Sequence, residues 1–155
     1  MKLVLLFAAG TVLNMSTCNK KIESVNNSGK GLSKTEIMAG KVWQVDELIH
    51  NVGCNNSHYI RGVKNTTDVN YDNMQFTFGM DGQGTHTDQY GQVHPTSWKF
   101  DKKDDKTIYL TVHLSADINF TWRMVEANDA MIYGTTAVRV DGGDILESFR
   151  LRPVQ

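Results

Sequence analysis

Apolar and polar residues alternate one by one between residues 74 and 80, and this alternation constrains the fold more than any other feature of the chain. The apolar members are Met74, Phe76, Phe78 and Met80. A period of two places them on one face of a strand, because successive side chains of a strand point to opposite faces. Asp81-Gly82 follows and supplies the positive φ of a tight hairpin, so the next segment returns antiparallel. Residues 73–114 are therefore predicted to form four strands joined by three tight turns.

The rest of the chain extends this meander to eight strands, because similar patterns recur between further turn sequences. The predicted strands are residues 41–49, 73–80, 84–90, 96–101, 107–114, 118–126, 130–140 and 144–152. Short turns favour an up-and-down order, and eight such strands can close into a barrel without exposed edges. We therefore predict an all-β fold, an eight-stranded antiparallel up-and-down barrel. A sandwich is the alternative, but its Greek-key connections would need longer crossings than most of these turns allow.

Two segments depart from the strand pattern. Ser33-Lys34-Thr35-Glu36 is a capping box, and Gly40 is placed to end the helix in the left-handed conformation. One short helix is thus predicted near residues 33–39. Residues 50–72 are rich in asparagine and have few regularly spaced apolar residues. We predict a long loop there, with room for a short helix around residues 57–62, and loops of this length in compact domains are often functional lids.

Length and charge limit the number of domains and the kinds of partner. A chain of 155 residues with 40% hydrophobic and 21% charged residues suits one folded domain with a core of ordinary size. The formal net charge is −1, and acidic and basic residues are spread through every segment. This distribution gives no basic patch for nucleic acid or for an anionic membrane surface. Nucleic acid is therefore excluded as a predicted partner.

The N-terminus has the features of a secretion signal. Lys2 precedes an apolar run, residues 3–13, that is too short to span a bilayer. Met15-Ser16-Thr17-Cys18 resembles the lipobox of bacterial lipoproteins, in which the cysteine is diacylated and becomes the new N-terminus. We predict a lipoprotein signal peptide over residues 1–17, lipid attachment at Cys18, a flexible polar tether over 18–32 and the folded domain over 33–155. The alternative is an ordinary secretory signal, with a Cys18–Cys54 disulfide.

Several short motifs resemble the lipocalin-like domains of bacterial lipoproteins. They are the short helix ending in Gly40, Lys41-Val42-Trp43, Phe76-Thr77-Phe78 with the turn Asp81-Gly82-Gln83-Gly84, and Trp98-Lys99-Phe100. The similarity covers most of residues 33–152. It implies a calycin-type barrel, often with an apolar cavity, and a location in the bacterial cell envelope, anchored to the outer membrane on its periplasmic or surface side. In classical lipocalins a late arginine packs over the tryptophan of the first strand, and Arg150 and Arg152 are the candidates for that role here.

A cavity in such a barrel would be walled by the inward-facing aromatic residues. The candidate ligand-binding residues are Phe76, Phe78, Trp98, Phe100, Phe120 and Trp122, with Tyr59 and Ile60 as apolar lid contacts from the long loop. Apolar and aromatic walls with a few polar groups are what small-molecule pockets use. The same residues could instead fill the barrel, in which case the loop 51–72 would dock a protein or glycan. We predict the carrier of a small hydrophobic or amphipathic ligand, with docking as the alternative.

Motifs for catalysis or metal binding are weak. There is no Gly-x-Ser-x-Gly elbow, phosphate-binding glycine loop, Cys-x-x-Cys or His-Glu-x-x-His sequence. His50, Cys54 and His58 would align three ligands along one helix face, but the nearby Gly and Asn residues disfavour that helix. We therefore expect no catalysis, no cofactor and no metal. The expected protein is a monomer that meets the membrane only through its lipid anchor.

Overall fold

The computed structural model describes residues 31–52, 55–140 and 143–155. The predicted signal peptide, Cys18, most of the tether and Cys54 lie outside these ranges. Within them the chain forms one helix and a series of strands. They are α1 (Lys34–Met38), β1 (Val42–Val52), β2 (Asn55–Ile60), β3 (Lys64–Asn65), β4 (Gln75–Phe78), β5 (Gln83–Thr87), β6 (Val93–Phe100), β7 (Ile108–Val112), β8 (Ile118–Ala127), β9 (Ile132–Val140) and β10 (Gly143–Pro153).

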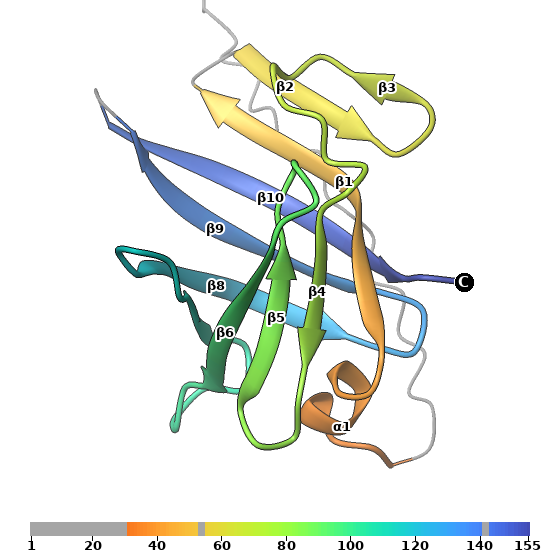
Figure 1. Ribbon diagram of the computed structural model, residues 1–155, viewed down its shortest axis with the longest axis vertical. Helices are drawn as coiled ribbons and strands as arrows, with labels where there is room; N and C mark the ends of the chain where they lie inside the picture. The colour runs from red at the N-terminus through yellow and green to blue at the C-terminus, as the bar shows by residue number, and fades with distance from the viewer. Residues whose placement is uncertain (1–30, 53–54, 141–142) are drawn as a thin grey trace, which may run out of the picture.

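Eight of these strands form a closed antiparallel barrel (Figure 1), which confirms the predicted fold class. Neighbours follow chain order from β4 to β10, and β10 then pairs with β1 to close the ring. That last pairing runs from Trp43 opposite Pro153 to Asn51 opposite Leu146. Closure leaves the barrel without a free edge, as the short turns of the sequence predicted.

The segment predicted as a long loop contains two strands, so the loop and the helix around residues 57–62 are wrong. β1 continues to Val52, and β2 pairs antiparallel with its second half, from Glu47 opposite Ile60 to Val52 opposite Asn55. β3 is a short outer strand that pairs antiparallel with β2. The backbone N–H and C=O groups of β1 can pair with those of a neighbouring segment, and this pairing does not require a hydrophobic pattern in that segment. The β2–β3 hairpin therefore extends the sheet beyond the eight-stranded ring.

The short helix forms as predicted and lies at one end of the barrel, at the bottom of Figure 1. The Ser33 hydroxyl accepts from the backbone amide of Glu36, the Glu36 carboxylate accepts from the amide of Ser33, and Gly40 has φ 75°. The side chain of Lys34 reaches β8, where its Nζ donates to the carbonyl of Val125 at 3.0 Å. The indole Nε1 of Trp43 donates to the carbonyl of Met38 at 2.8 Å, and both side chains are fully buried. The helix thus covers this end of the core.

The arginines suggested by the family resemblance lie elsewhere than over Trp43. Arg150 binds the Asp46 carboxylate through Nε at 2.9 Å and Nη2 at 2.8 Å, and Arg152 Nε lies 3.2 Å from the same carboxylate. The register of β1 shifts between Val45 and Glu47, and Asp46 lies at this irregularity. The cation over the Trp43 ring is Lys41, whose Nζ lies 5.5 Å from the ring centroid. The arginine-over-tryptophan arrangement is therefore replaced by an arginine–aspartate cluster.

No helix in the part of the chain that the structure describes has the length and apolar character needed to cross a membrane.

Replacing Trp98 by alanine should lower the free energy of unfolding by about 3–5 kcal/mol, because the change removes a large core side chain and leaves a cavity. Trp98 is only 6% exposed and packs edge-on against Phe78, with ring centroids 5.2 Å apart. Urea denaturation measures the change. Tyr90→Ala is the matched control, since Tyr90 is 78% exposed and its loss should change stability by less than about 0.5 kcal/mol. Equal effects of the two variants would contradict the core position of Trp98.

Candidate functional site

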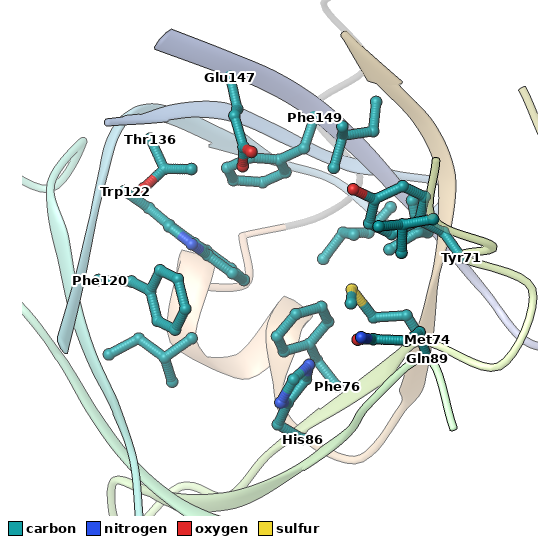
Figure 2. A pocket seen from close by; sticks show the side chains of 15 residues that line it. Tyr71, Met74, Phe76, His86, Gln89, Phe120, Trp122, Thr136, Glu147 and Phe149 are labelled. Carbon is teal, nitrogen blue, oxygen red and sulfur yellow. The ribbon is translucent and has the colours of Figure 1, made fainter. Parts of the chain in front are cut away.

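The barrel contains a cavity of about 250 Å³ (Figure 2). Aromatic side chains form much of its wall, joined by aliphatic residues of β1, β7 and β10. The aromatic residues are Tyr71, Phe76, Phe120, Trp122 and Phe149. They come from the loop before β4 and from strands β4, β8 and β10, so closure of the barrel is what gathers them around one space.

The aromatic walls are fixed by contact with one another. The rings of Phe76 and Trp122 meet edge to face with centroids 5.3 Å apart, and Trp122 lies 4.6 Å from Phe149 in a tilted arrangement. Gly134 on β9 lies directly opposite Phe149, and a Cβ atom there would come within 2.9 Å of the phenyl Cζ. The absence of a side chain at Gly134 therefore makes room for the Phe149 ring. These contacts give the cavity a preformed shape.

A row of side chains with polar atoms crosses one wall of the cavity. Trp122 lies opposite Thr136, Thr136 opposite Glu147, and Glu147 opposite His50, across β8, β9, β10 and β1. Directly opposite residues share a face of the sheet, so this row faces inward together. Thr136 is only 5% exposed, and its hydroxyl has no hydrogen-bond partner among the residues that the structure describes. A buried polar group without a partner costs about 1–3 kcal/mol, which a bound ligand would offset.

Glu147 belongs to a hydrogen-bonded chain that ends at Tyr71. Its Oε1 lies 2.8 Å from His50 Nδ1, and His50 Nε2 lies 3.0 Å from the Tyr71 hydroxyl. With its proton on Nδ1, His50 donates to Glu147 and accepts from Tyr71. Burial raises the pKa of Glu147, and the neighbouring His50 acts in the opposite direction. Burial also raises the pKa of Tyr71 to about 12, so its phenol stays protonated at neutral pH.

The opposite wall has a second polar group, His86 on β5. Strands β5 and β9 stand four places apart in the eight-stranded ring, so His86 and Thr136 face each other across the barrel. The imidazole stacks on Phe76 with ring centroids 4.8 Å apart, and in the described part of the chain neither ring nitrogen finds a hydrogen-bond partner. Burial, followed by the charge of His94, lowers the pKa of His86 to about 4. His86 is therefore neutral at pH 7 and presents one donor and one acceptor.

The residues predicted as cavity walls divide into two groups. Phe76, Phe120 and Trp122 line the cavity. Phe78 and Trp98 lie in the packed core, with Phe100 partly buried against it. A cavity lined by aromatic residues and a filled core were predicted from the sequence as alternatives. The barrel contains both, at different positions along its length.

Tyr59 and Ile60 do not form a lid of the kind expected from a loop. Tyr59 is a strand residue only 2% exposed, and its hydroxyl donates to Asp72 at 2.6 Å. Ile60 is the next residue of β2, so its side chain points to the opposite face from that of Tyr59. The prediction failed because the segment pairs with β1 and turns Tyr59 into the core.

Sequence reasoning missed Tyr71, His86, Thr136 and Glu147 as cavity residues. For Glu147 a signal existed, because Phe149 and Leu151 have the same parity on β10 and both are buried. An acidic residue at an inward position of a strand is a marker of a polar site. Thr136 follows Ile132 and Gly134 on the inward face of β9 in the same way. Tyr71 had no such signal, because it lies in an irregular connection.

The hypothesised metal site does not form among the described residues. His50 lies opposite Ser57 and His58 lies opposite Ile49, so the two imidazoles point to opposite faces of the β1–β2 pair. His58 instead contacts Glu47 at 2.8 Å. Cys54 lies outside the described ranges, and within them no group of three or more His, Cys, Asp and Glu side chains is arranged to hold a metal ion.

Comparison with known proteins adds no relative from which a function could be transferred. No protein-family model, no curated protein and no solved structure matches the chain. The closed barrel and the shape and chemistry of its cavity are therefore the features from which a function is inferred.

Stability should fall as the pH is lowered from about 6.5 towards 4, in part because of His86. Its pKa is lowered in the folded protein, so the unfolded chain binds this proton more readily, and protonation in that interval favours unfolding. His86→Leu removes the titration. Thermal unfolding at a series of pH values should show the wild type losing more stability than the variant over this interval. Parallel curves for the two proteins would contradict a buried neutral His86.

Proposed function

We propose that this protein is a lipid-anchored, lipocalin-like carrier that binds a small hydrophobic or amphipathic molecule inside its barrel without catalysing a reaction. The apolar cavity of about 250 Å³ is the observation that carries this proposal. An engineered apolar cavity of about 150 Å³ already binds benzene, so the space here suits a molecule of roughly ten non-hydrogen atoms. The preformed aromatic walls support the same interpretation, since a rigid site loses little entropy on binding.

The alternative is a docking module that uses residues 51–72. In its favour, the β2–β3 hairpin is a separate surface outside the ring, and Val63 at its turn is 79% exposed. Against it, a docking module is the function expected of a filled barrel, whereas this barrel contains a cavity. The carrier is therefore the better supported of the two functions.

The hydrogen-bonded chain at the cavity wall supports binding more than catalysis. Both nitrogens of His50 are already engaged, by Glu147 and by Tyr71. A nucleophile or base needs a lowered or well-matched pKa, whereas burial raises that of the Tyr71 phenol to about 12. The arrangement holds Tyr71 and Glu147 in place on the wall, which is what a binding site requires.

The proposed location is the bacterial cell envelope, with the barrel tethered to the outer membrane. The support is in the sequence, where an apolar run ends just before Met15-Ser16-Thr17-Cys18 and a polar stretch follows. A diacylated Cys18 would hold the carrier near a membrane surface, where sparingly soluble molecules are concentrated. The anchor and the cavity thus suit the same role.

The full chain should bind naphthalene, a ten-carbon apolar probe, and lose this binding when the cavity is filled. Val45→Phe places a larger side chain in the cavity, because Val45 lines it and is 2% exposed. Saturation-transfer NMR of the probe should show a signal for the wild type and a signal at least about fivefold weaker for the variant. Val93→Phe is the control, since Val93 is 64% exposed and lies on the surface. If the wild type does not bind naphthalene, this result would contradict the carrier proposal and favour the docking module.

Cys18→Ala should release the protein from the membrane fraction of bacteria that express it, because the acyl chains would have no attachment point. Cell fractionation and detection of the barrel measure the distribution. Cys54→Ala is the matched control and should stay with the membrane. If the Cys18 variant also stays with the membrane, the anchor lies elsewhere in the chain.

A further inference from the structure

The cavity wall holds a donor and an acceptor side by side. Thr136 and Glu147 lie directly opposite each other on β9 and β10, and both line the cavity (Figure 2). Within the described ranges the Thr136 hydroxyl has no hydrogen-bond partner, although the residue is only 5% exposed. Of the Glu147 carboxylate oxygens, Oε1 is engaged by His50. A carboxylate has about four acceptor positions, so Glu147 can accept further hydrogen bonds.

We propose that the ligand is an uncharged alcohol or phenol of roughly ten non-hydrogen atoms, whose hydroxyl group accepts from Thr136 and donates to Glu147. This inference rests on the proposed carrier function and names the class of ligand that the same cavity takes. The apolar body of the ligand contacts the aromatic walls formed by Phe76, Trp122 and Phe149.

A hydroxyl group fits this pair because it is a donor and an acceptor at one atom. A pure hydrocarbon would leave Thr136 Oγ1 unpaired and buried, as it is without a ligand, so it would not gain the free energy of a hydrogen bond to this hydroxyl. A ketone or ether could accept from Thr136 but offers Glu147 no proton. Sites built to hydrogen-bond a hydroxyl discriminate strongly against analogues that lack it, because their own polar groups are left unpaired.

The charges around the cavity disfavour ionised ligands. No Lys or Arg occurs among its lining residues, so a carboxylate ligand would lack a counter-ion and would lie against Glu147. An ammonium ligand could pair with Glu147, but it would also have to give up its own hydration to enter the cavity. Burying a further charge in an aromatic cavity carries a large desolvation cost. The neutral hydroxyl avoids both costs.

The test compares four probes of one shape on the full chain by isothermal titration calorimetry. They are 3-phenylpropanol, propylbenzene, 3-phenylpropanoate and 3-phenylpropylamine. The alcohol should bind about tenfold more tightly than propylbenzene, which corresponds to one well-formed additional interaction. It should bind at least about tenfold more tightly than the carboxylate and the amine.

Three variants locate the hydroxyl subsite. Thr136→Val keeps the shape of the side chain and removes its hydroxyl, so the preference for the alcohol over propylbenzene should fall to less than about threefold while propylbenzene binds as before. Thr135→Val is the control on the neighbouring position of β9, where alternation points the side chain to the other face, and it should leave the preference unchanged. His86→Leu alters the opposite wall and should also preserve it.

The outcomes separate this inference from the function on which it rests. If no probe binds, the carrier proposal itself fails. If propylbenzene binds as tightly as the alcohol, the carrier proposal stands and the hydroxyl subsite is overturned, as it is if an ionised probe equals the alcohol. Loss of the preference in His86→Leu but not in Thr136→Val would also overturn the assignment to Thr136 and Glu147.

Discussion

The pairing of β1 with β10 is the interaction on which the rest of the structure depends. It joins the first and last strands of the domain and converts an open meander into a closed ring. Closure pairs the two terminal strands of the ring with each other, so neither β1 nor β10 is an open edge of the eight-stranded ring. The Arg150–Asp46 ion pair lies on this seam, with Nη2 and Oδ2 2.8 Å apart. Closure also brings His50 opposite Glu147, which no shorter-range contact could do.

Once the ring is closed, the volume of its side chains decides which parts are solid. At the α1 end, Trp43 and Met38 are fully buried and hydrogen-bonded to each other through indole and carbonyl. Further along the barrel, the aromatic rings meet edge to face and leave a space between them. A solid level and a hollow level thus coexist in one barrel.

The fold was largely predictable because its information is local. The period-two pattern around Phe76, the Asp81-Gly82 turn and the capping box at Ser33 each specify structure within a few residues, and each formed. The strand around Phe76 is shorter than predicted, and Met80 beyond its end is 63% exposed. The β2–β3 hairpin was not predictable in this way. Its strands are polar, and they are ordered by pairing with β1, a contact that leaves no hydrophobic pattern in the segment itself. Tyr59 was consequently placed in a lid instead of in the core.

The sequence by itself determined the strand class, the turns, the short helix and the presence of inward aromatic residues such as Phe76 and Trp122. Only the tertiary structure decided which of them border a cavity and which polar groups face it. The reason is that cavity walls are made by residues far apart in the chain, with Tyr71, Thr136 and Glu147 brought together by strand register and ring closure. Local periodicity fixes which face a side chain occupies, but it does not fix what lies across the barrel from it.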